Sequence, residues 1–217
     1  MPSAKADALL RRALKPAAWV GCLLPLAWTV FDAFTGGLGA DPIREVTHRT
    51  GFTALTLLMA TLAVTPLRRM TGWNPLVQLR RLLGLFAFFY ACLHFAIYLA
   101  DQGFDAGFIV EDVVKHPYVT VGFTALLLLI PLAVTSTRKS IRRLGKRWVK
   151  LHRMIYLVAA LGVVHFYWLV KRDVTQPLEF GAVFLVLMAL RLPLLAGSKK
   201  MRPARSPSRS SASPQET

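Results

Sequence analysis

Cysteine is scarce in this sequence, which has only two cysteines among its 217 residues. Cys22 and Cys92 each lie within an apolar run. Two cysteines cannot supply a Cys-rich metal site, and a disulfide inside a bilayer is not expected. We therefore interpret both as small packing residues.

Phosphate-binding and dinucleotide-binding motifs are also missing. The sequence contains no glycine-rich phosphate loop and no Rossmann pattern of strand, glycine-rich turn and helix. We find no stretch that is typical of a soluble module. The sequence therefore predicts that this chain has no nicotinamide-binding site of its own.

Acidic residues are few, with 11 Asp and Glu against 27 Lys and Arg, and the net charge is +16. In a soluble protein this charge would suggest nucleic acid, but here basic clusters alternate with apolar runs. Twenty of the 27 lie in the N-terminus, two connections and the tail: Lys5, Arg11, Arg12, Lys15, Arg68, Arg69, Arg80, Arg81, Arg138, Lys139, Arg142, Arg143, Lys146, Arg147, Lys150, Lys199, Lys200, Arg202, Arg205 and Arg209. The positive-inside rule makes that side cytoplasmic, with both termini. We expect anionic membrane lipids, and not nucleic acid, to neutralise the positive charge on that side.

Six apolar runs approach or exceed the roughly 20 residues that a helix needs to cross a bilayer. They are rich in Leu, Ala, Val and Phe and lack the alternation of β-barrel strands. The runs cover about 17–35, 45–65, 82–100, 118–136, 148–170 and 177–195. The sequence predicts an all-α polytopic membrane protein, a bundle of six transmembrane helices.

The chain divides into a cytoplasmic N-terminus (1–16), a transmembrane domain (17–195) and a tail (196–217). The first apolar run is interpreted as a retained span, because "FTGGLGADPI" after it is typical of a loop and not of a cleavage site. The tail is rich in Ser, Pro and Arg and has few residues able to bury, so we expect it to be disordered and cytoplasmic.

Four of the five histidines lie within predicted spans, and His116 is expected to be an ordinary loop residue. In the predicted topology His94 and His165 lie at similar depth on two helices, in the half nearer the outside. A single histidine inside a span can be explained by a hydrogen bond between helices. Two at matched depth, flanked by aromatic and small residues, favour the two axial positions of a haem iron. Copper and zinc are less favoured, because no carboxylate or thiolate cluster lies at that depth.

His152 lies thirteen residues before His165, about 20 Å away along a helix and roughly 140° around it. The two cannot bind the same iron. A second haem nearer the cytoplasm would need a ligand about fourteen residues before His94, and that position is Arg80. His152 is therefore a candidate ligand of a second haem or of another cofactor, and its partner is left open.

Other residues have two interpretations each. His48 and Arg49 lie near the outer face, where they are candidate contacts of a haem propionate or a quinone head, or Arg49 simply snorkels to the interface. Gly51, Gly84 and Gly162 are expected to permit close helix packing or the approach of a haem.

Two histidines thirteen apart on one helix, facing a histidine on an earlier helix, resemble the ferric-reductase-like domain of NADPH oxidases and ferric reductases. In that domain the earlier helix usually bears two histidines and two haems stack, whereas Arg80 stands at the second position here. The blocks "THRTGFTALTLLMATLAVTPLRR", "RRLLGLFAFFYACLHFAIYL" and "KRWVKLHRMIYLVAALGVVHFYWLVK" more closely resemble the MsrQ (YedZ) family. That resemblance covers roughly residues 17 to 195.

The resemblance implies haem b and FMN in a subunit of the bacterial inner membrane that passes electrons outward. It implies a periplasmic molybdopterin partner of the MsrP type, which reduces methionine sulfoxide in oxidised proteins and carries the catalysis. The implied donor is the quinone pool or a cytosolic flavin reductase. Arg80, Arg81 and Arg153 are then candidate contacts of the flavin phosphate, with inner-face snorkelling as the alternative for Arg153 and Arg191.

Two other functions stay open. The first is the membrane subunit of a ferric or superoxide-type reductase, against which the missing nicotinamide domain counts. The second is a proton-coupled transporter that uses intramembrane histidines. Such a transporter should show broken helices or internal repeats, and we expect neither here. A haem Soret band that shifts on reduction by dithionite distinguishes the transporter from both reductase functions.

Overall fold

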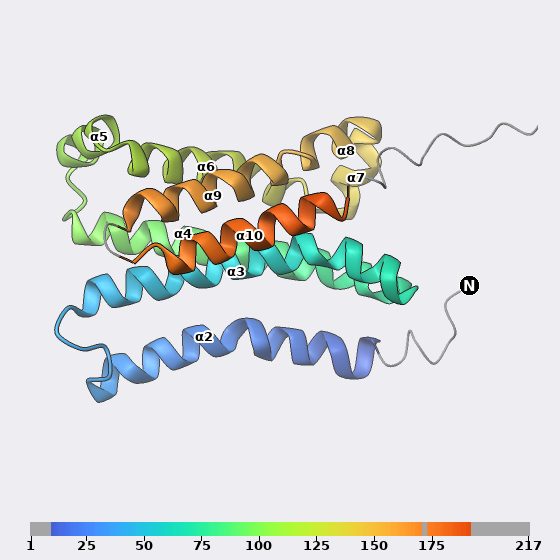
Figure 1. Cartoon of the computed structure of the whole chain (residues 1–217), viewed down its shortest axis with the longest axis horizontal. Coiled ribbons are helices and arrows are strands. Elements are labelled where there is room, and N and C mark those ends of the chain that lie inside the picture. The colour runs from blue at the N-terminus through green and yellow to red at the C-terminus, as the bar shows by residue number, and fades with distance from the viewer. Residues whose placement is uncertain (1–9, 171–172, 192–217) are drawn as a thin grey trace, which may run out of the picture.

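The computed structural model describes residues 10–170 and 173–191, and every regular element in these residues is a helix (Figure 1). The prediction of an all-α membrane protein is confirmed. Five helices are long and apolar enough to cross a bilayer, and they span Arg12–Thr35, Pro42–Thr71, Asn74–Asp101, Pro117–Val134 and Lys146–Leu169. The predicted disordered tail (196–217) lies outside the described residues.

The elements follow one another with short connections. In chain order they are η1 (Leu10–Leu14), α2 (Lys15–Thr35), α3 (Pro42–Thr71), η2 (Asn74–Leu76), α4 (Val77–Asp101), α5 (Ala106–Lys115), α6 (Pro117–Val134), α7 (Arg138–Leu144), α8 (Lys146–His152), α9 (Ile155–Leu169) and α10 (Thr175–Ala189). The sixth apolar helix, α10, has 15 residues. At about 1.5 Å per residue it is roughly 22 Å long, which is shorter than a bilayer core.

The two ends of the bundle differ in composition, and we name them by their connections. The α5 end holds α5 and the α2–α3 connection; the α7 end holds α7, the α3–α4 connection and the last turn of α10 (Figure 1). In the predicted topology the α5 end is periplasmic. At that end Asp41 and Asp105 accept hydrogen bonds from the first backbone N–H groups of α3 and α5, which fixes where these helices begin.

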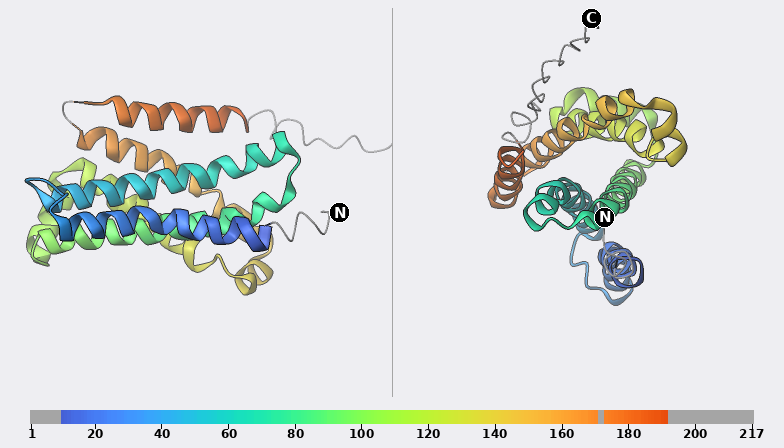
Figure 2. Two further views of the ribbon diagram at one scale, coloured as in Figure 1. Left: turned by 90° about the horizontal axis from the view of Figure 1, so that it is seen from below. Right: turned by 90° about the vertical axis from the view of Figure 1, so that its right-hand side faces the viewer.

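The core lies between two helix pairs, α3 with α4 and α6 with α9, which make the most extensive contacts in the molecule. In the end-on view α2 and α10 lie at two different edges of the bundle (Figure 2). Tyr90 of α4, with 1% of its surface exposed, ties α2 to the core. Its hydroxyl donates to the carbonyl of Cys22 (2.7 Å) and accepts from the N–H of Leu26 (3.1 Å). This bridge replaces a helical hydrogen bond next to Pro25, where the backbone ladder of α2 is already interrupted.

An internal repeat relates the two helix pairs, and our expectation of no repeat was wrong. "GFTAL" occurs at 51–55 in α3 and again at 122–126 in α6, and "LAVT" follows at 62–65 and 132–135. The helices after them also correspond, with "VQLRR" at 77–81 and "VKLHR" at 149–153. Both halves run from the α5 end to the α7 end and back, so the repeat is parallel and not inverted (Figure 1).

The expectation of unbroken helices was also wrong. The fifth predicted span is interrupted by a turn at Arg153 and Met154, between α8 and α9. Because "VKLHR" is displaced by 72 residues from "VQLRR" whereas His165 is displaced by 71 from His94, the second half has one residue fewer between this motif and the histidine. The turn lies within that shorter stretch. The angle predicted between His152 and His165 assumed an ideal helix and does not apply across this turn.

Candidate functional site

His94 of α4 and His165 of α9 face one another across the bundle, as their matched depth predicted. Their ring centroids are 6.2 Å apart and the rings are nearly perpendicular, at 83°. Both side chains are half-buried. The two helices carry these residues to the same place because they are the second helices of the two repeats.

Each of these rings is held by a backbone carbonyl from the partner helix of its own repeat. Nδ1 of His94 lies 2.9 Å from the carbonyl oxygen of Thr47, and Nδ1 of His165 lies 2.7 Å from that of Tyr118. In both cases the carbonyl is 47 residues earlier in the chain. A carbonyl only accepts, so each Nδ1 carries the proton and each Nε2 keeps its lone pair.

Glycines let the carbonyl-bearing helices approach these rings. A Cβ added at Gly51 would lie 3.0 Å from Cε1 and from Nδ1 of His94. One added at Gly122 would lie 2.7 Å from Nδ1 of His165 and 2.8 Å from its Cε1. Gly51 was predicted to permit close approach, whereas Gly122 was missed. The second "GFTAL", at 122–126, is the sequence signal that could have identified it.

The paired rings fit the axial positions of a haem. Two imidazole nitrogens at about 2.0 Å on opposite sides of one metal put the ring centroids about 6 Å apart, close to the distance seen here. Hydrogen bonding of the outer ring nitrogen to a carbonyl is the usual orientation of a metal-binding histidine. Residues 10–170 and 173–191 contain no group of three His, Cys, Asp or Glu able to hold a metal ion. The pair therefore suits a cofactor that needs two protein ligands.

His152 lies apart from this pair, towards the α7 end. Its ring stacks on Trp148 with centroids 3.9 Å apart, and its Nδ1 is 3.2 Å from the Trp148 carbonyl. Its Nε2 is buried and has no hydrogen-bond partner among the described residues. In the repeat, His152 corresponds to Arg80, so the two occupy equivalent positions of the two halves. His152 stays a candidate cofactor ligand.

The three arginines predicted to contact a flavin phosphate differ in exposure. Arg81 and Arg153 are exposed, whereas Arg80 is half-buried. Arg191, for which snorkelling was the alternative, instead turns into the bundle and is 7% exposed. No pattern in the sequence indicates this orientation, because it depends on the carbonyl of Leu62 in α3.

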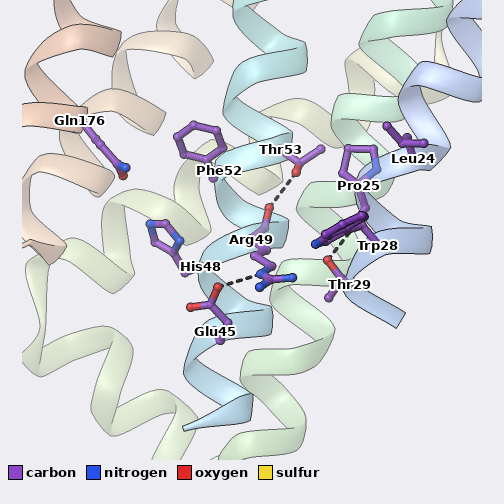
Figure 3. A pocket seen from close by; sticks show the side chains of 10 residues that line it. All are labelled: Leu24, Pro25, Trp28, Thr29, Glu45, His48, Arg49, Phe52, Thr53 and Gln176. Atoms are coloured by element: carbon purple, nitrogen blue, oxygen red, sulfur yellow. Dashed lines mark hydrogen bonds and ion pairs between the residues drawn. The ribbon is translucent and has the colours of Figure 1, made fainter. Parts of the chain in front are cut away.

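His48 and Arg49 line a cavity of about 490 Å³ at the α5 end, between α2, α3 and α10 (Figure 3). Arg49 donates to Asp32 of α2 (2.5 Å) and to Glu45 (2.7 Å). Its guanidinium is therefore neutralised by protein carboxylates, and Asp32 was missed by the sequence analysis. His48 is exposed, and its ring lies 6.0 Å from that of Phe166, the neighbour of His165.

Comparison with known proteins agrees with this geometry. Residues 50–163, more than half of the chain, match the family described as ferric reductase like transmembrane component. The fold and the facing histidines are thus those of a ferric-reductase-like membrane protein.

Curated relatives narrow the class further. The protein-methionine-sulfoxide reductase heme-binding subunit MsrQ of Herminiimonas arsenicoxydans is 49% identical over 183 residues, which cover 82% of this chain and 84% of that protein. The MsrQ of Rhodospirillum rubrum is 49% identical, covering 88% and 92%. That of Deinococcus radiodurans is 50% identical, covering 88% and 95%. The chain belongs to the MsrQ family.

Proposed function

We propose that this protein is the haem b-binding membrane subunit of a methionine sulfoxide reductase system in the bacterial inner membrane. It passes electrons to a periplasmic molybdopterin enzyme of the MsrP type, which repairs oxidised proteins. Catalysis resides on that partner. Its relatives are named as haem-binding subunits of protein-methionine-sulfoxide reductase, which supports the proposal.

The observation that carries the proposal is the pair of facing imidazoles. The ring centroids of His94 and His165 are 6.2 Å apart, and the Nδ1 of each ring contacts a carbonyl, which leaves each Nε2 unprotonated. Each ring is held by a carbonyl and backed by a glycine, which supports a fixed ring orientation for binding iron. Haem held there supplies reversible one-electron transfer within the bilayer.

The direction of electron flow rests on the charge asymmetry. The α7 end carries the basic connection 135–147, and the positive-inside rule assigns it to the cytoplasm, with both termini. His94 and His165 then lie in the periplasmic half, where a partner can approach the α5 end.

The proposed donors are quinol or a cytosolic flavin reductase, with FMN as a second cofactor on the cytoplasmic side. The cavity beside His48 and Arg49 supports a quinol head, because polar and aromatic side chains line it together, among them Gln176, Trp28 and Phe52. The sequence of this chain has no nicotinamide-binding motif, which supports a separate donor.

The experiment uses detergent-purified protein and its His94→Ala and His165→Ala variants. Each variant should lose most of the bound haem, because the remaining histidine of the pair supplies only one of the two ligands. His116→Ala is the matched control, since His116 is exposed and lies on the loop before α6. Full haem content and an unchanged Soret band in both site variants would refute the pair.

Electron delivery is tested in membranes reduced by a quinol analogue or by a flavin reductase with NADH. Purified MsrP-type partner plus methionine sulfoxide should reoxidise the haem, and His165→Ala should not support turnover. Haem that stays reduced with an active partner present would refute the MsrQ-type function and leave haem binding intact.

A further inference from the structure

The two facing histidines belong to two helix pairs, and each ring is oriented within its own pair. The ring of His94 is bonded to a carbonyl of α3, and the ring of His165 to a carbonyl of α6. The distance and the angle between the two rings depend instead on how the pairs are placed against one another. The contacts that fix this placement at the α5 end therefore act on the histidine site.

One side-chain hydrogen bond fixes α4 at this end. The hydroxyl of Tyr98, one turn after His94, donates to Oδ2 of Asp112 on α5 at 2.6 Å. Within residues 10–170 and 173–191, no other side-chain hydrogen bond joins α4 to α5, α6 or α9. A hydrogen bond from a hydroxyl to a carboxylate is short and stronger than one between neutral groups. Both side chains are half-buried, so water competes with this bond less than with an exposed one.

α5 is in turn fixed to the start of α6, where the second ring is held. The hydroxyl of Thr120 in the first turn of α6 donates to the carbonyl of Val113 in α5. Tyr118, whose carbonyl holds His165, lies in the same turn. α5 therefore connects the helix that carries one histidine to the turn that holds the other.

A second contact of Asp112 lies at the surface. Nδ1 of His116 is 2.6 Å from Oδ1 of Asp112, and the His116 side chain is 51% exposed. Exposed ion pairs contribute little to stability. The bond to Tyr98 is therefore the one that fixes α5 against α4, and loss of the His116 ring should leave it in place.

The internal repeat indicates that a helix pair does not itself need the Tyr98 hydroxyl. Leu169 stands 71 residues later at the corresponding position of α9, just as His165 corresponds to His94. The second pair thus packs with an apolar side chain at this position. The Tyr98 ring stacks on Phe95 with centroids 6.0 Å apart, and a phenylalanine ring would keep that contact. The hydroxyl therefore has a role beyond the packing of α4.

We propose that Asp112 is a positioning residue of the histidine pair. Through Tyr98 it fixes the two helix pairs at the spacing and angle at which His94 and His165 hold a haem, with ring centroids 6.2 Å apart and planes at 83°. Groups that orient metal ligands without touching the metal control metal affinity, so loosening α5 lets the rings part. This proposal rests on the proposed haem binding and extends it to a residue that lies between two spans.

The experiment compares four variants of the detergent-purified protein. Tyr98→Phe and Asp112→Leu each remove the hydrogen bond, whereas Asp112→Asn removes the charge and keeps an oxygen that accepts from Tyr98. Glu111→Leu is the matched control, because Glu111 is the neighbouring acid of α5 and pairs with the exposed Lys115.

All four variants should be purified with haem, because both axial ligands are intact. Haem transfer to excess apomyoglobin should be about three- to tenfold faster in Tyr98→Phe and Asp112→Leu, a smaller effect than loss of a carbonyl that contacts the ring itself. The other two variants should release haem at the wild-type rate. The double variant Tyr98→Phe/Asp112→Leu should release it no faster than either single variant, because both remove the same bond.

The EPR signal of oxidised low-spin haem distinguishes positioning from a structural role, because it depends on the angle between the two imidazole planes. It should shift in Tyr98→Phe and Asp112→Leu, and Asp112→Asn should restore it. A lower melting temperature with an unchanged EPR signal would overturn the proposal, as would equal haem release by Asp112→Leu and Glu111→Leu.

Should Asp112→Leu fail to accumulate, Tyr98→Phe decides the question, since it deletes one oxygen and keeps the ring. Wild-type protein that contains no haem would overturn the proposed function and this proposal together. Haem that is bound and released identically by the wild type and all variants would overturn this proposal alone.

Discussion

Gly122→Ala should disturb the haem site although it adds only one methyl group. The new Cβ would lie 2.7 Å from Nδ1 and 2.8 Å from Cε1 of His165, on a ring that the Tyr118 carbonyl holds at 2.7 Å. Comfortable contacts are about 3.5–4.0 Å, so the ring must retreat by about 1 Å. It cannot do so and keep that hydrogen bond.

The size of the effect follows from two costs. Loss of the carbonyl that orients a metal-binding histidine lowers metal affinity about 10- to 100-fold. Overpacking of a close-packed site costs about 1–3 kcal/mol in addition. Alanine is otherwise favoured over glycine inside a helix by about 1 kcal/mol, so a loss must come from the clash.

The assay titrates haemin into apoprotein and measures haem affinity and the Soret maximum for three variants. Gly51→Ala should have a smaller effect than Gly122→Ala, because its Cβ would lie 3.0 Å from the His94 ring. Gly84→Ala is the control, since its Cβ would meet only Thr61, at 3.7 Å. Equal haem affinity in Gly122→Ala and Gly84→Ala would refute this account of the site.

Three further predictions concern the bundle. A topology reporter fused after Leu195 should read cytoplasmic and one inserted at Gly107 periplasmic; the reverse would invalidate the proposed direction of electron flow. Tyr90→Phe removes the hydroxyl that bridges the interrupted ladder of α2 and should cost about 1–3 kcal/mol of stability in detergent; an unchanged melting temperature contradicts this. Asp32→Asn and Arg49→Gln should show a coupling of about 0.5–1 kcal/mol in a double-mutant cycle, because their ion pair is only partly exposed to solvent; additive effects contradict it.

The internal repeat changes how the competing functions are weighed. A repeat had been associated with transporters, but this one is parallel and superposes histidine on histidine: His94 on His165. Duplication of a helix pair that carries one imidazole produces two imidazoles facing one another. Here the repeat therefore supports a bis-histidine cofactor site.

The sequence alone determined the helical class, the approximate positions of the apolar helices and the matched level of His94 and His165 along the bundle. These depend on local properties: the length of apolar runs, the spacing along a helix and the distribution of basic residues. The matched depth of His94 and His165 followed from such counting. The start of α3 at Pro42 was not predicted: it lies three residues before the predicted span, and the side chain of Asp41 caps it.

Only the tertiary structure decided which way each side chain points. In a bilayer most faces of a helix are apolar, so hydropathy does not reveal its rotation or its partner. The carbonyls that hold His94 and His165 come from other helices, 47 residues away. Arg191 turns inward because Pro66 frees a carbonyl on α3, which is a contact across 129 residues of sequence. Such contacts form between helices after each is already in place, and no local pattern in the chain encodes them.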